Sequence, residues 1–134
     1  MNSKHKNGTI AELKAAVYYE EKGWTVFWPT SSQSPCDFIA ACGVMNLRIQ
    51  VKAAYKFTRP SGCSYVQVTI RKGSGGSKKY TEEDCDLIVV VYEDRIWVFP
   101  REDIIPYTTI NLENGQKLRK KTKGVIDASI YRVK

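Results

Sequence analysis

Residues 34–56 read SPCDFIAACGVMNLRIQVKAAYK, and the fold depends on this stretch. Residues 36–42 and 45–53 hold enough apolar, β-branched and aromatic side chains to predict two strands, and Gly43 with Val44 between them predicts a tight turn. The stretch is therefore a predicted β-hairpin.

The register of this hairpin decides which side chains meet, because a slip of one residue moves every side chain to the other face. In the second strand, Arg48, Gln50 and Lys52 share one face. The other face is apolar and consists of Leu47, Ile49, Val51 and Ala53. With a two-residue loop at 43–44, Asp37 lies across from Gln50, with Cβ atoms about 5 Å apart. A carboxylate, an amide and an ammonium group then converge on one patch.

Two interpretations of this polar patch are open. Alternation of apolar and polar residues is typical of any antiparallel strand with one solvated face, so a single Asp or Lys here is most simply a surface residue. Asp37, however, adjoins the apolar run of residues 38–41, where a strand normally carries no charge. The combination of the three polar groups favours a functional site.

A helix is predicted to begin near Thr9 and to end at Gly23. Its apolar stripe consists of Ile10, Leu13, Ala16 and Val17. Thr9 suits the N-cap, and Glu12 follows three residues later, which is the capping-box spacing. Glu12 therefore either caps the backbone of Thr9 or projects beside the stripe toward the hairpin, where it adds a second acid to Asp37.

The rest of the chain predicts further short elements. Strands are expected at residues 24–28, 65–70, 86–92 and 95–99, with residues 55–59 leading out of the hairpin, the start of a short helix at 81–84, and short strands at 107–112 and 126–133. Asp86 is expected to have a structural role.

Residues 72–79, KGSGGSKK, form a basic, glycine-rich loop. It lacks the Gly-Lys-Ser/Thr ending of a phosphate-binding loop, so no nucleotide cofactor is expected. The loop either contacts DNA or only links two strands.

The net charge of +7 is unevenly distributed along the chain. Residues 46–79 carry +8 without a single acid, residues 80–103 carry −6, and residues 111–134 carry +5. Basic blocks of this kind attract phosphate backbones, so nucleic acid is the expected partner, and an acidic protein also fits. The residues expected to contact DNA are Lys56, Arg59, Arg71, Lys72, Lys78 and Lys79.

The length of 134 residues predicts one domain, with a core over about residues 8–104 and a basic extension over 105–134. No apolar run reaches the length of a membrane span, and the start of the chain lacks the pattern of a signal peptide. We therefore expect a cytoplasmic protein without a membrane partner. The four cysteines contain no Cys-x-x-Cys pair and the chain has one histidine, which argues against a zinc site.

The order of these motifs resembles the PD-(D/E)XK nuclease superfamily. A Pro-x-Asp element ending at Asp37 and a Gln-x-Lys element ending at Lys52 lie on one hairpin, after a helix that carries Glu12. The segments GTIAELKAAVYYEEKGWTVFWP, CDFIA and LRIQVKAAYK are similar to its group I intron-associated homing endonuclease branch, in which Gln in the Gln-x-Lys element is familiar. The similarity runs over about residues 8–100. It implies an α/β fold with a restriction-endonuclease-like core, a central mixed β-sheet and an N-terminal helix carrying Glu12.

The resemblance implies a metal-dependent endodeoxyribonuclease that hydrolyses phosphodiester bonds in double-stranded DNA with Mg²⁺, for which Mn²⁺ substitutes. Asp37 is the implied primary metal ligand, with Glu12 as a second and the backbone carbonyl of Val51 as a third. Gln50 offers an amide oxygen where relatives have Glu. Lys52 is expected to orient the attacking water or to stabilise the charge of the transition state. The implied catalytic residues are Glu12, Asp37, Gln50 and Lys52.

A homing-type endonuclease is the leading hypothesis. A homodimer or homotetramer is expected, because a small domain with one site must pair to cut both strands or to recognise a long target. A Holliday junction resolvase is a related alternative. A non-catalytic DNA-binding module on a degenerate nuclease fold is another, since Gln50 removes one negative charge from the expected site, and an interaction protein for an acidic partner is a third.

Overall fold

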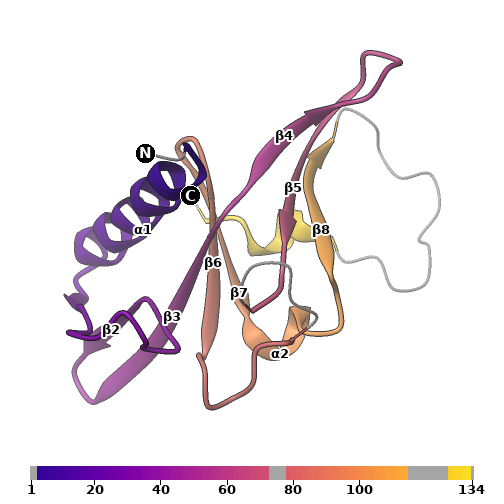
Figure 1. Ribbon diagram of the computed structural model, residues 1–134. Helices are drawn as coiled ribbons and strands as arrows, with labels where there is room; N and C mark the ends of the chain where they lie inside the picture. The colour runs from indigo at the N-terminus through magenta and orange to yellow at the C-terminus, as the bar shows by residue number, and fades with distance from the viewer. Residues whose placement is uncertain (1–2, 73–77, 115–126, 134) are drawn as a thin grey trace.

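Two β-sheets and an N-terminal helix make up the fold of the computed structural model, which describes residues 3–72, 78–114 and 127–133 (Figure 1). The helices are α1 (Ser3–Glu21), α2 (Arg101–Ile104) and a 3₁₀ helix, η1 (Ala128–Tyr131). The strands are β1 (Thr25–Phe27), β2 (Phe38–Cys42), β3 (Met45–Ala53), β4 (Tyr55–Thr58), β5 (Ser64–Thr69), β6 (Leu87–Tyr92), β7 (Arg95–Pro100) and β8 (Thr109–Asn114).

The larger sheet has the strand order β1-β2-β3-β6-β7 and is mixed. Strands β3 and β6 run parallel at its centre, and the other neighbours are antiparallel. The smaller sheet, β4-β5-β8, is antiparallel and is reached directly from the end of β3. Figure 1 shows α1 on one side of the central strands and the smaller sheet on the other. The expected α/β architecture with a central mixed sheet and an N-terminal helix is confirmed.

The β2–β3 hairpin has the predicted register. Cys42 pairs with Met45 across a two-residue loop, and Phe38 pairs with Ile49 at the other end. Gly43 has a φ of 59°, which is the conformation that a type II′ turn requires of its first loop residue and that glycine adopts without strain. The turn chemistry therefore fixes the pairing on which the arrangement of the polar side chains depends.

Two hydrophobic clusters lie on opposite faces of the larger sheet. Alternation along β6 divides its side chains between them, with Ile88 and Val90 in one cluster and Val89 and Val91 in the other. The first cluster joins the sheet to the smaller sheet, α2 and η1, and the second lies under α1. Strand β6 is thus buried on both faces, as expected of a central parallel strand.

Helix α1 differs from its prediction in where it begins and in which face it buries. It begins at Ser3, so Thr9 lies inside the helix and is not an N-cap, and the capping-box interpretation of Glu12 is wrong. The face packed on the sheet carries Ala11, Ala15, Ala16 and Tyr19. Three of the four residues in the predicted apolar stripe, Ile10, Leu13 and Val17, are exposed instead. The helix ends as predicted, with Gly23 at a φ of 93°.

Other differences are local. Residues 82–84 form a turn rather than the start of a helix, and residues 128–131 form the 3₁₀ helix η1 where a strand was expected. Strand β8 overlaps the weak strand predicted at 107–112. Residues 73–77 of the glycine-rich loop and residues 115–126 of the basic tail lie outside the described residues. None of the helices in the described part of the chain is long and apolar enough to cross a membrane.

Candidate active site

Asp37 is held at the point where the β2–β3 ladder ends. Its backbone N–H donates to the Ile49 carbonyl at 2.8 Å, and its Oδ2 accepts the Val51 N–H at 2.7 Å. Because β2 starts at Phe38, opposite Ile49, the Val51 N–H has no backbone partner on β2, and the carboxylate takes that place. The half-buried carboxyl group is thus fixed against β3 by the backbone.

The Val51 carbonyl faces the same side. The N–H and C=O groups of one strand residue point to the same edge of the strand, so this carbonyl points to the edge of β3 on which Asp37 lies, beyond the last backbone pair of β2. A backbone oxygen therefore lies on the same edge of β3 as the carboxyl group of Asp37.

Glu12 approaches the same carboxyl group from α1. The alanines on the buried face of α1 are short, so the helix lies close to the sheet, and the Glu12 carboxyl group reaches hydrogen-bonding distance of Asp37. Burial raises the pKa of Glu12 to about 7, and the hydrogen bond and the negative charge of Asp37 add to the shift. Two carboxyl groups held this close to each other favour the binding of a cation between them.

Among the described residues, no lysine, arginine or histidine forms an ion pair with Glu12 or Asp37. Gln50 lies on the polar face of β3, opposite Asp37 in the extended register, and its half-buried amide makes no hydrogen bond within the described part of the chain. Its amide oxygen is therefore not engaged by another group of the described residues.

Lys52 is the next residue on that face, and its ammonium group is held from two sides. Nζ donates to the Arg71 carbonyl at 2.8 Å and lies 5.3 Å from the centre of the Tyr80 ring. The Tyr80 hydroxyl donates to the same Arg71 carbonyl at 3.2 Å. Burial lowers the pKa of Lys52, while the nearby Asp37 carboxylate acts in the opposite direction. The amine is thus partly desolvated and held in place.

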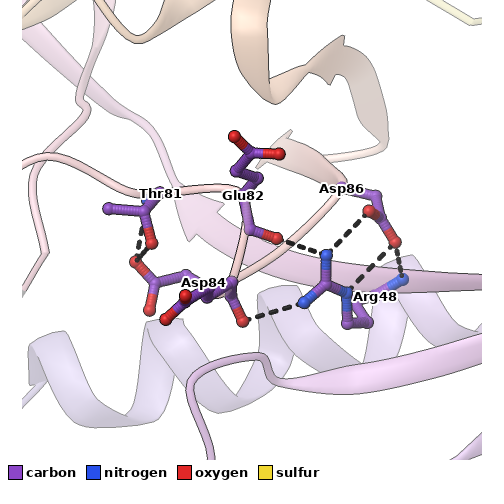
Figure 2. Close-up of polar contacts among 6 residues, drawn as sticks. Arg48, Thr81, Glu82, Asp84 and Asp86 are labelled. Carbon is purple, nitrogen blue, oxygen red and sulfur yellow. Dashed lines mark hydrogen bonds and ion pairs between the residues drawn. The ribbon is translucent and has the colours of Figure 1, made fainter.

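Arg48 completes the polar face of β3 and has a different environment. Figure 2 shows its guanidinium group between the Asp86 carboxylate and the backbone of the 82–84 turn. The guanidinium contacts Asp86 at 3.0 Å, the Glu83 carbonyl at 2.8 Å and the Glu82 carbonyl. Hydrogen bonds from Arg48 hold the pKa of Asp86 below its ordinary value. These contacts agree with the structural role expected of Asp86.

The six basic residues expected to contact DNA fall into two groups. Arg71 and Lys72 are engaged within the chain: the Arg71 guanidinium binds the carbonyls of Ile70 and Tyr107, and Lys72 Nζ lies 2.8 Å from the buried Asp84 carboxylate. The others are exposed and make no ion pair among the described residues: Lys56, Arg59, Lys78 and Lys79.

Sequence reasoning identified the carboxyl pair, Gln50 and Lys52, but missed the residues that hold them. Tyr80 stands between a basic loop and an acidic run, and nothing in its local sequence indicates that its ring lies against Lys52. The contact of Arg48 with the 82–84 turn was equally hidden, although alternation did place Arg48 on the same face as Lys52.

The groups around Asp37 supply oxygen donors for a divalent metal ion. No group of three or more His, Cys, Asp and Glu side chains that could hold an ion occurs in residues 3–72, 78–114 and 127–133. The carboxyl pair with its raised Glu12 pKa, the Val51 carbonyl and the Gln50 amide nevertheless supply only oxygen atoms, which is the chemistry that Mg²⁺ prefers. The residues therefore fit such an ion, with two side-chain carboxylates rather than three.

A half-buried lysine on β3 and a carboxyl pair contributed by α1 and by Asp37, just before β2, are the groups that the sequence predicted for a nuclease site, and comparison with known families agrees that the chain is a nuclease. The family model described as PD-(D/E)XK endonuclease matches residues 1–134. The chain therefore belongs to the PD-(D/E)XK endonuclease family, which confirms the resemblance seen in the sequence.

Two individual proteins are similar to this chain. Protein 5.3 of Escherichia phage T7 is 26% identical over 104 residues, which is 78% of this chain and 86% of the phage protein. The solved structure of a bacterial homing endonuclease, I-Ssp6803I, superposes with a TM-score of 0.78 at 24% identity, covering 98% of this chain and 89% of that one. At this identity the second likeness shows the fold.

Proposed function

We propose that this chain is a metal-dependent endodeoxyribonuclease that hydrolyses phosphodiester bonds in double-stranded DNA, and that it is of the homing type. The carboxyl pair of Glu12 and Asp37, which forms no ion pair with a cationic side chain of residues 3–72, 78–114 and 127–133, is the observation that supports the metal dependence. The homing type is supported by the likeness to a bacterial homing endonuclease.

Asp37 and Glu12 would hold Mg²⁺, or Mn²⁺ in its place, together with the Val51 carbonyl and the Gln50 amide oxygen. The ion supplies a lowered pKa for a bound water and positive charge beside the scissile phosphate. Because Gln50 is neutral, we expect weaker metal binding than with a third carboxylate, and one tightly held ion rather than two.

Lys52 acts on the phosphate side of the site. The Arg71 carbonyl and the Tyr80 ring fix its ammonium group, so little reorganisation is needed when negative charge develops on the phosphate. Four exposed basic residues neutralise the DNA backbone around the site: Lys56, Arg59, Lys78 and Lys79. The protein acts in the cytoplasm as a homodimer or homotetramer.

The test is cleavage of supercoiled plasmid and of a randomised linear duplex library, with Mg²⁺ or with EDTA, followed by sequencing of the cut ends. Lys52→Ala should slow cleavage by about 10² to 10³ while DNA binding persists. Lys22→Ala is the matched control, because Lys22 also lies over a tyrosine ring, that of Tyr18, but is exposed just after the last residue of α1.

The outcomes separate the alternatives. Mg²⁺-dependent cuts at a recurring sequence support the homing type, whereas preferential cutting of four-way junctions would indicate a resolvase. Salt-sensitive DNA binding without cleavage, by wild type and by both variants, would show a non-catalytic module.

A further inference from the structure

Helix α1 carries several large apolar side chains on the face turned away from the sheet, which is unusual for a helix of a monomer. Most side chains packed on the sheet are small, with Ala11 at 2% and Ala15 at 0% exposure, and Tyr19 near the end of the helix is the large one among them. Other large ones point away from the sheet, and Leu13 and Val17 are each 54% exposed. A surface helix normally buries its largest apolar residues. The outward face of α1 is therefore an apolar surface without a partner in the described part of the chain.

This outward face borders a groove of about 430 Å³. One wall is α1, with Ile10, Leu13 and Val17, and the other is the turn between β6 and β7, with Glu93, Asp94 and the adjoining Ile96. Lys14 bridges the two walls through a hydrogen bond of 2.7 Å from Nζ to the Glu93 carbonyl. A contiguous apolar strip with a charged border is typical of a protein interaction surface.

The charges at the two ends of the strip identify the occupant. Exposed Lys6 lies one helical turn before Ile10, and Glu21, which lines the groove, lies one turn after Val17. The strip therefore has a basic residue at one end and an acidic residue at the other. The positions of Lys6 and Glu21 are equally far from a point between Leu13 and Lys14, and so are those of Ile10 and Val17. A second copy of the same helix laid antiparallel across this point places Ile10 opposite Val17 and Lys6 opposite Glu21, twice over. A two-fold interface requires this kind of self-complementarity.

We infer that the outward face of α1 is a two-fold dimer interface, in which this helix packs antiparallel on the α1 of a second copy of the chain. The inference deepens the assembly named in the proposed function by assigning its surface. The two sheets then lie outside a central helix pair. Glu12 points toward Asp37 and away from the interface, so each copy keeps a complete site.

The test measures molar mass and dimer dissociation without DNA or metal, by sedimentation velocity and light scattering. Leu13→Glu should weaken the dimer by about 30-fold or more, as expected when a central apolar contact is replaced by a charge. Val44→Glu is the matched control, because Val44 is 98% exposed in the β2–β3 turn, away from α1, and it should leave the dimer intact. Circular dichroism checks that each variant is folded.

The charge-swap variants test the antiparallel pairing itself. Lys6→Glu and Glu21→Lys should each weaken the dimer by about 3- to 10-fold, since each creates two like-charge contacts, and the double variant should restore wild-type affinity. A monomeric wild type, a dimer insensitive to Leu13→Glu, or a double variant no better than the single ones would overturn the inference. Because no step depends on cleavage, such a failure leaves the proposed nuclease activity standing.

Discussion

Two aspartates flank β3 and perform the same backbone task in opposite electrostatic settings. Asp37 precedes β2 and Asp86 precedes β6; each donates its N–H to a β3 carbonyl, and each accepts a β3 N–H through Oδ2, at 2.7 Å from Val51 and 2.9 Å from Arg48. Asp86 then binds the Arg48 guanidinium, whereas Asp37 faces a second carboxyl group.

The difference separates a structural carboxylate from a functional one. Asp86 is neutralised by the chain itself, so its charge stabilises the fold and is unavailable to a ligand. The repulsion between Asp37 and Glu12 is not offset by an ion pair among the described residues, although Lys52 lies near enough to Asp37 for the carboxylate to act on its pKa. Groups kept in this state are candidates for binding an external cation.

Asp37→Asn should reduce the single-turnover rate of DNA cleavage by about 10³ or more, because it removes the negative charge on which metal binding depends. The fold should persist, since the amide oxygen of Asn can still accept the Val51 N–H. Asp86→Asn is the control for the same chemical change on the other side of β3, and it should keep its cleavage rate. Equal loss of activity in the two variants would show that Asp37 and Asp86 do not differ in their importance for cleavage.

Asp86→Asn should instead lower the free energy of unfolding by about 1 to 2 kcal/mol at neutral pH, as expected for a charge-assisted hydrogen-bonded pair. This change in the free energy of unfolding is small because both side chains are more than a third exposed to solvent, at 35% for Arg48 and 39% for Asp86. Urea unfolding measures it, with Asp37→Asn as the comparison. An unchanged unfolding midpoint would show that the ion pair of Arg48 and Asp86 does not contribute to stability.

Tyr80→Leu should slow cleavage by about 10-fold with a smaller effect on DNA binding, because Lys52 loses the ring that holds its ammonium group. Tyr80→Phe keeps the ring and loses only the hydroxyl bond to the Arg71 carbonyl, so it should rescue most of the rate. If both variants fall equally, the hydroxyl and not the ring is what matters.

The contributions of Asp86 and Glu12 to stability should depend on pH with opposite signs. The pKa of Asp86 is lowered by Arg48, so its contribution is present above the unfolded value of about 4 and is lost as the pH falls through the lower folded value. The pKa of Glu12 is raised to about 7, so its contribution is present below the unfolded value and is lost as the pH rises through about 7.

Glu12→Gln should consequently gain stability relative to wild type at pH 8 in EDTA, where wild type carries both charges. The Asp86→Asn variant should lose less stability than wild type between pH 5 and pH 3. Urea unfolding across this pH range measures both effects, and a Glu12→Gln variant that is less stable than wild type at pH 8 would contradict the first.

Local pattern was sufficient to predict the hairpin and its polar face. Gly43 and the period-two alternation of residues 45–53 fix the register, and the register places Asp37 just before β2, where its carboxylate accepts the Val51 N–H. The buried strand ending at Tyr92 was likewise predicted by its run of β-branched residues.

The inner face of α1 could not be predicted in this way. Helical periodicity favours the stripe of large side chains, whereas the sheet selects the alanine face, because short side chains allow the close approach that Glu12 needs to reach Asp37. Tyr80 and the 82–84 turn depend on contacts between residues far apart in the chain, with Arg71 and Arg48. Periodicity within a short window contains no information on such contacts.

Thermal unfolding of wild type, Asp37→Asn and Asp86→Asn, each with EDTA and with Mn²⁺, tests directly whether the carboxyl pair of Glu12 and Asp37 binds the metal ion. If the carboxyl pair is the metal site, Mn²⁺ raises the unfolding midpoint of wild type and of Asp86→Asn, because the ion binds only the folded state, and leaves that of Asp37→Asn unchanged. A Mn²⁺-induced shift in Asp37→Asn as large as in wild type would contradict the account.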